Sequence, residues 1–124
     1  MLFRSAILGL TFKPETDDMR DSPAIPIVSR LAEDGADVRV YDPEGMDAAR
    51  PLLPKSLAYC RDALDAAHGA DALVLLTEWN EFRALSPVRL AATMRGRVLV
   101  DLRNVYDPTA MRQAGFSYYG IGRT

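Results

Sequence analysis

Short apolar segments alternate along this chain with segments that open on helix-capping signals, and this alternation restricts the fold more than any other feature. The run from Phe3 to Leu10 has the character of a strand buried on both faces, which is typical of a parallel sheet. Ser22-Pro23 then places a capping serine before a proline at the first helical position, and predicts a helix over residues 23–34 that Gly35 ends. A strand over 37–41 completes a βαβ unit.

The same order of elements continues to the end of the chain. The further predicted strands cover residues 58–60, 71–76, 98–101 and 116–119, and the further predicted helices cover 44–50, 61–68, 87–94 and a segment from about 108. The 71–76 strand is predicted to be buried on both faces. Together the elements predict an α/β fold, a three-layer Rossmann-like sandwich with a mostly parallel sheet of five to six strands. With the strand order 3-2-1-4-5-6, ligands bind between the carboxyl ends of the first and fourth strands.

Composition limits the class of protein. A length of 124 residues fits a single domain covering 1–124, and an apolar fraction of 48% is enough for a buried core. The net charge of -2 and the pI near 5.3 argue against a nucleic acid or an anionic membrane as the main partner. One cysteine and one histidine exclude an internal disulfide framework and a Cys/His metal cluster, and no signal peptide or membrane span is seen, so we expect a cytoplasmic protein.

The segment after the first strand is the first candidate for binding. Residues 11–21 form a connection far longer than is usual in a βα unit, and it carries Lys13 and Arg20 among four acidic residues. These cations would lie near a helix N-terminus, which favours anions. The alternative is that Lys13 and Arg20 form surface ion pairs with the neighbouring acids. The G-x-G-x-x-G fingerprint of a main dinucleotide site is absent from this turn, which favours a substrate nucleotide held by side-chain cations.

Two other predicted strand ends contribute to the same edge. Trp79 follows the fourth strand and is expected to be a packing residue, while Arg103 follows the fifth strand and brings a forked cation. Cys60 is expected to be a buried structural thiol, and His68 to lie at a helix C-terminus as a capping residue. No catalytic residue and no metal ligand is expected in this domain.

Five segments in the same order carry a family resemblance across nearly the whole chain. They are Gly9-Leu10-Thr11-Phe12-Lys13, residues 17–23 (Asp-Asp-Met-Arg-Asp-Ser-Pro), Tyr41-Asp42-Pro43, Thr77-Glu78-Trp79 and Asp101-Leu102-Arg103-Asn104. Together they resemble the C-terminal, nucleotide-sugar-binding domain of the UDP-glucose/GDP-mannose dehydrogenase family. Among its members, the bacterial UDP-glucose 6-dehydrogenases are the most similar.

The resemblance implies an activity and also which domain of the enzyme supplies each function. Such enzymes oxidise the C6 alcohol of a nucleotide sugar to a carboxylate in two NAD-dependent steps, using a cysteine that precedes this domain. By resemblance, Lys13 and Arg103 would bind the UDP-sugar, and Arg20 would reach NAD held mainly by a preceding N-terminal domain. The implied partners are the UDP-sugar and the N-terminal and central domains of a homo-oligomeric enzyme. The isolated domain would be inactive, and both UDP- and GDP-sugars stay open as ligands.

Two alternatives belong to other functional classes. A receiver-like signalling domain is also α/β and places acids after its first strand, but here Asp17 and Asp18 sit deep in a long segment and Arg103 follows the fifth strand, where a receiver needs lysine. The second alternative is a docking domain without a ligand of its own. Binding of UDP would separate it from a nucleotide-sugar site.

Overall fold

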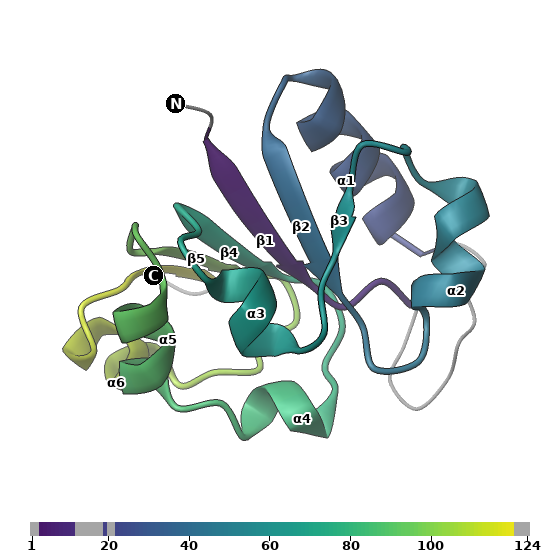
Figure 1. Cartoon of the computed structure of the whole chain (residues 1–124). Helices are drawn as coiled ribbons and strands as arrows, with labels where there is room; N and C mark the ends of the chain where they lie inside the picture. Colours follow the sequence, from purple (N-terminus) through teal and green to yellow (C-terminus); the bar gives the residue numbers. More distant parts are fainter. Residues whose placement is uncertain (1–2, 12–18, 20–21, 121–124) are drawn as a thin grey trace.

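The structure, a computed structural model, describes residues 3–11, 19 and 22–120, and its centre is a six-stranded sheet. The strands are β1 (Arg4–Leu8), β2 (Asp37–Tyr41), β3 (Ala58–Tyr59), β4 (Ala72–Leu75), β5 (Val98–Asp101) and β6 (Ser117–Gly120). They are all parallel, in the order β3-β2-β1-β4-β5-β6 (Figure 1). The predicted Rossmann-like sheet and its strand order are therefore confirmed.

Helices cover the sheet from both sides, but unequally. They are α1 (Ala24–Glu33), α2 (Met46–Ala49) with the 3-10 turn η1 (Arg50–Leu52), α3 (Ala63–Ala67), α4 (Asn80–Arg83), α5 (Pro87–Thr93) and α6 (Pro108–Gln113). Buried residues of α1 and α2 share one core cluster with the β1–β2 half of the sheet, while those of α3, α4, α5 and α6 share a second cluster on the opposite face. From β1 the chain adds β2 and β3 on one side and, later, β4, β5 and β6 on the other. Because the crossovers are right-handed, helices that connect strands in opposite directions lie on opposite faces of the sheet.

Capping residues place the helices close to where the sequence predicts them. The Ser86 hydroxyl accepts a hydrogen bond from the N–H of Arg89 at 3.3 Å, and each of α5 and α6 has a proline in its first turn. The Ser22 hydroxyl accepts from the N–H of Ala24 at 3.2 Å, and α1 begins at Ala24, one residue later than predicted. None of the helices within the described ranges is long and apolar enough to cross a membrane.

Two features of the fold depart from the sequence prediction. The short helix α4 directly after Trp79 was not expected, because four residues show no helical periodicity. The strand predicted over 71–76 is not buried on both faces, since Val74 of β4 is only half-buried. The α1 side of β4, β5 and β6 has no covering helix in the part of the chain that the structure describes, and this accounts for the exposure of Val74.

Candidate nucleotide-sugar site

A buried carboxylate, Asp42, ties the end of β2 to the residues that follow β1. Its Oδ2 atom accepts hydrogen bonds from the N–H groups of Leu10 at 2.7 Å and Thr11 at 3.2 Å, and from the Thr11 hydroxyl at 3.3 Å. Its Oδ1 atom accepts from the N–H groups of Glu44 at 2.9 Å and Gly45 at 2.7 Å. These donors compensate the complete burial of the carboxylate. Asp42 therefore fixes the point at which the chain leaves β1.

Thr77, two residues beyond the end of β4, holds the same point. The Thr77 hydroxyl donates to the carbonyl oxygen of Thr11 at 2.8 Å. Gly9 has a φ of +97°, and a Cβ atom at this position would lie 2.6 Å from atoms of Thr77. Only glycine satisfies both requirements. The Ser22 hydroxyl also donates to the carbonyl oxygen of Leu10. Hydrogen bonds therefore join the residues after β1, β2 and β4 and the start of α1 into one connected edge of the sheet.

Arg103 lies at this edge, where the predicted ligand site falls. Its Nε atom donates to the carbonyl oxygen of Leu76 at 2.9 Å, and the N–H of Leu76 donates to the carbonyl oxygen of Leu8 at 2.9 Å. The half-buried Arg103 side chain is thereby linked to the carboxyl ends of β4 and β1. This is the place where the strand order reverses and where open α/β sheets bind ligands.

A second buried carboxylate shapes the turn that carries Arg103. Asp101 accepts from the N–H of Arg103 at 3.2 Å through Oδ1, and from the N–H of Tyr106 at 2.9 Å and the Tyr118 hydroxyl at 2.7 Å through Oδ2. Asn104 has a φ of 53°, in the left-handed region that asparagine tolerates better than most residues. The turn is thus held by buried hydrogen bonds, which orient a cation at the edge of the sheet.

The opposite side of this edge has the wrong charge for a phosphate. A hollow of about 340 Å³ is lined by Tyr41, Asp62, Ala63, Leu64, Glu81 and Leu85. Burial, a hydrogen bond with Glu81 and the nearby carboxylates raise the pKa of Tyr41 above its usual range, so its hydroxyl stays protonated. The carboxylates of Asp62 and Glu81 would repel an anion. Of these two regions, the one around Arg103 is the better phosphate site.

Of the predicted ligand-binding side chains, the structure describes one. Arg103 lies at the predicted edge, whereas Lys13 and Arg20 fall outside the described residues. The anchors on either side of their segment, Thr11 and Ser22, do lie at this edge. The roles of Lys13, Arg20 and Arg103 stay predictions.

Cys60 and Trp79 have the surroundings of packing residues. Cys60 is 5% exposed, and burial raises the pKa of its thiol, which disfavours the reactive thiolate. Trp79 is also buried, within the core cluster of the α3 face, as predicted. Among the described residues no group of three or more His, Cys, Asp or Glu side chains is placed to hold a metal ion.

Sequence reasoning did not predict the roles of Asp42, Thr77 and Asp101. Each is a polar residue at or within two residues of the end of a strand, and each is fully buried. That position was the available signal, because a polar side chain at the end of a buried strand needs hydrogen-bond partners. The partners themselves come from distant parts of the chain, so the sequence did not reveal them.

Comparison with known proteins identifies the family. Residues 6–108 match the domain described as "UDP-glucose/GDP-mannose dehydrogenase family, UDP binding domain". The chain belongs to this family. The matched range of the UDP binding domain includes Asp42, Thr77, Asp101 and Arg103, so the whole connected edge lies within it. The receiver-like alternative is therefore wrong.

Relatives within the UDP-glucose/GDP-mannose dehydrogenase family are much longer than this chain. The UDP-glucose 6-dehydrogenase of Rhizobium meliloti (strain 1021) is 58% identical over 118 residues, which cover 95% of this chain and 27% of that protein. A UDP-glucose dehydrogenase from Pyrobaculum islandicum is structurally similar, with a TM-score of 0.79 and 31% identity over 99% of this chain and 26% of that chain. An NDP-N-acetyl-D-galactosaminuronic acid dehydrogenase from Methanosarcina mazei Go1 has a TM-score of 0.84 and 27% identity, covering 98% of this chain and 25% of that chain. The chain thus spans about a quarter of the length of these relatives, in their C-terminal part.

Proposed function

We propose that this chain is a single UDP-sugar-binding domain of an NAD-dependent UDP-glucose 6-dehydrogenase, which oxidises UDP-glucose to UDP-glucuronate. One observation carries the proposal beyond family membership. Arg103 is hydrogen-bonded to the Leu76 carbonyl at the switch point of the sheet, the place between β1 and β4 where the strand order reverses. A guanidinium in that place suits the diphosphate of a nucleotide sugar. Lys13, which follows the anchored Thr11 by two residues, would supply a second cation to the same ligand.

NAD does not fit the described turn after β1. In a dinucleotide site the glycines of this turn let the pyrophosphate approach the backbone. Here the space beside Gly9 is occupied by Thr77, and the chain continues as Leu10-Thr11 instead of the fingerprint. In the proposal, the turn after β1 is therefore not the main NAD site. In the proposal, NAD is held mainly by a preceding domain, with Arg20 as a contact from this chain.

The remaining parts of the proposed enzyme lie elsewhere in a longer polypeptide. The nucleophilic cysteine would belong to the preceding part, because Cys60 is buried with a raised pKa. The full-length enzyme would be a homo-oligomer of the cytoplasm, a location that suits the free thiol of Cys60. The 124-residue chain alone would bind the nucleotide sugar without oxidising it.

Calorimetric titration of the 124-residue chain with UDP, UDP-glucose and GDP tests the proposal. We expect UDP and UDP-glucose to bind and GDP to bind more weakly, with no NADH formed when NAD is added. Absence of binding by all three nucleotides to the folded chain would favour a docking domain without its own ligand. Formation of NADH by the chain alone would contradict the proposed division of labour.

A further inference from the structure

The edge strand β6 reaches the candidate ligand site through one hydroxyl group. The register pairs Tyr118 of β6 with Leu99 of β5, and side chains alternate along a strand, so Tyr118, Leu99 and Asp101 share one face of the sheet. The tyrosine side chain reaches past Leu99, and its hydroxyl donates to Oδ2 of Asp101 at 2.7 Å. Asp101 is the last residue of β5, and Arg103 follows it by two residues. One hydrogen bond therefore joins Tyr118 to the turn that carries Arg103.

The Tyr118 hydroxyl has two acceptors within reach but a single proton. Its oxygen lies 2.7 Å from Oδ2 of Asp101 and 3.3 Å from the carbonyl oxygen of Tyr106. The proton points to the carboxylate, which is nearer and carries a charge. Asp101 has no exposure and Tyr118 is 5% exposed, so bulk water does not reach this hydrogen bond. Loss of the hydroxyl would leave a buried carboxylate short of a donor, which is costly.

The turn after β5 depends on the same carboxylate. Oδ1 of Asp101 accepts from the N–H of Arg103 at 3.2 Å, and Oδ2 accepts from the N–H of Tyr106 at 2.9 Å. Both ends of the turn are thus bonded to one side chain. Between them, Asn104 has a φ of 53°, a conformation that persists only where the surrounding structure holds it. A shift of the Asp101 carboxylate would therefore move the turn, and Arg103 with it.

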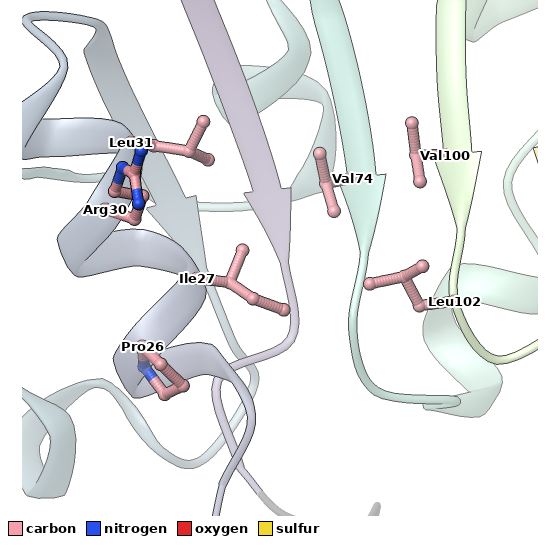
Figure 2. A pocket seen from close by; sticks show the side chains of 7 residues that line it. All are labelled: Pro26, Ile27, Arg30, Leu31, Val74, Val100 and Leu102. Carbon is pink, nitrogen blue, oxygen red and sulfur yellow. The ribbon is translucent and has the colours of Figure 1, made fainter.

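The other face of the sheet gives this turn little support. The side chain of Leu102, between Asp101 and Arg103, lines a groove of about 490 Å³ together with Val74, Val100 and residues of α1 (Figure 2). No helix among the described residues covers β4, β5 and β6 on this side, and Leu102 is only half-buried. The turn is therefore anchored mainly from the opposite face, where Asp101 is buried.

We infer that Tyr118 is a positioning residue of the nucleotide-sugar site: its hydroxyl, acting through Asp101, holds the turn that places Arg103 at the ligand edge. The inference rests on the proposed function, since it takes Arg103 as a contact of the UDP-sugar. The residues that match the family's UDP binding domain end at 108, so Tyr118 and the rest of β6 lie beyond them. A side chain outside the matched range thus supports the site within it.

The Nε–H group of Arg103 reports the position of this side chain without any ligand. It donates to the carbonyl oxygen of Leu76 at 2.9 Å, and this hydrogen bond slows its exchange with water. NMR of the isotope-labelled 124-residue chain measures the exchange rate, and the loss of the signal in Arg103→Ala assigns it. We expect Tyr118→Phe to raise the exchange rate about three- to tenfold, the usual size of coupling within one hydrogen-bond network.

Tyr41→Phe is the matched control for the loss of a buried hydroxyl. Tyr41 is 8% exposed, and its hydroxyl is hydrogen-bonded to a different carboxylate, that of Glu81. Each variant keeps the aromatic ring, so both should fold, and urea unfolding measures the stability that each one loses. Tyr41→Phe should leave the exchange rate of the Arg103 Nε–H group unchanged. An unchanged rate in Tyr118→Phe, or equal increases in both variants, would overturn the inference.

UDP titration tests the same coupling on the ligand. Tyr118→Phe should weaken UDP binding about three- to tenfold. In the Arg103→Ala background, Tyr118→Phe should weaken it no further, because Tyr118 acts through Arg103. An equal loss of affinity in both backgrounds would overturn the inference, since Tyr118 would then affect the ligand by another route.

The two measurements separate this inference from the proposed function. Faster Arg103 Nε–H exchange in Tyr118→Phe, in a chain that binds no UDP, would support the positioning of Arg103 and count against the proposed ligand. UDP binding that Tyr118→Phe leaves unchanged would keep the ligand and contradict the inference. If Tyr118→Phe does not fold, the unmodified chain decides. UDP should then shift the NMR signals of the Tyr118 ring, because coupling is reciprocal, and signals that stay in place at saturation would contradict the inference.

Discussion

The Nε atom of Arg103 donates to the carbonyl oxygen of Leu76 at 2.9 Å, which joins the turn after β5 to the end of β4. Leu76 in turn is bonded to the end of β1 through its N–H group. The Arg103 guanidinium is therefore held at the switch point of the sheet by a hydrogen bond to a backbone carbonyl, and it does not lie on a flexible surface side chain. The Arg103 side chain is oriented before any ligand arrives, which reduces the entropy lost on binding.

We expect Arg103→Ala to weaken UDP binding. A lost charge-assisted hydrogen bond corresponds to about 1.5–3 kcal/mol, or roughly ten- to hundredfold in affinity. Arg103→Lys should retain part of the binding, because lysine keeps the charge but not the fork. Calorimetry of the 124-residue chain measures the effect. Arg112→Ala, at an exposed position of α6, is the control, and equal affinities for both alanine variants would exclude Arg103 as a ligand.

Lys13 and Arg20 are expected to serve different anions in the full-length enzyme. Lys13→Ala should damage the use of UDP-glucose, and Arg20→Ala should chiefly raise the NAD requirement, each by about 1.5–3 kcal/mol. Separate kinetics for the two substrates, with the fold checked by circular dichroism, measure the split. Normal kinetics of both variants would favour the surface ion-pair interpretation of this segment.

Asp71 gives the domain a specific acid sensitivity. A hydrogen bond from the Arg95 side chain and another from the N–H of Arg4 lower the pKa of Asp71 to about 2 from its usual 3.8. A lowered pKa in the folded state means that the contribution to stability is complete above pH about 4 and is lost as the pH falls towards about 2. Asp71→Asn should therefore flatten the fall in stability over this range.

Urea unfolding midpoints at pH 7, 4 and 3 measure this effect. Asp47→Asn provides the control, because the side chain of Asp47 is fully exposed on α2. The acid sensitivity would have another origin if the Asp71 and Asp47 variants lost stability in parallel with the unmodified chain.

Cys60→Ala is expected to leave function intact. The buried thiol is replaced by a smaller apolar group, with a packing loss of roughly 1 kcal/mol. The full-length enzyme should keep most of its turnover, and the native thiol should react slowly with a thiol reagent until the protein unfolds. Loss of turnover by orders of magnitude in a folded variant would mean that Cys60 is the nucleophile after all.

The elements of this fold are predictable from the sequence wherever a local signal decides them. Ser86-Pro87 predicts α5, and the apolar runs 3–10 and 98–101 predict β1 and β5. In these segments the capping residues or the apolar side chains that determine the element are neighbours in the sequence. The helix α4 has no such signal in its four residues. Its position follows from packing, since Phe82 is completely buried and contacts Tyr41 at the end of β2.

The site is predictable only in part. The rule for open α/β sheets places Arg103 at the ligand edge from the sequence alone. The hydrogen bonds that fix this edge join residues far apart in the chain, such as Asp42 with Leu10 and Thr77 with Thr11. Val74 shows a different limit: its apolar neighbours in the sequence predict burial on both faces, yet its side chain is only half-buried, because no helix among the described residues covers it.

The uneven cover of the sheet also affects how the chain opens. The free energy of a local opening increases with the apolar area that it brings into water, and Tyr119 on the edge strand β6 is already exposed. The strand β1 is buried between α1 and α3, so we expect its backbone amides to exchange with solvent only when the domain unfolds globally. In the 124-residue chain, the amides of β6 would exchange earlier, through partial openings that leave the β1–β2 half folded.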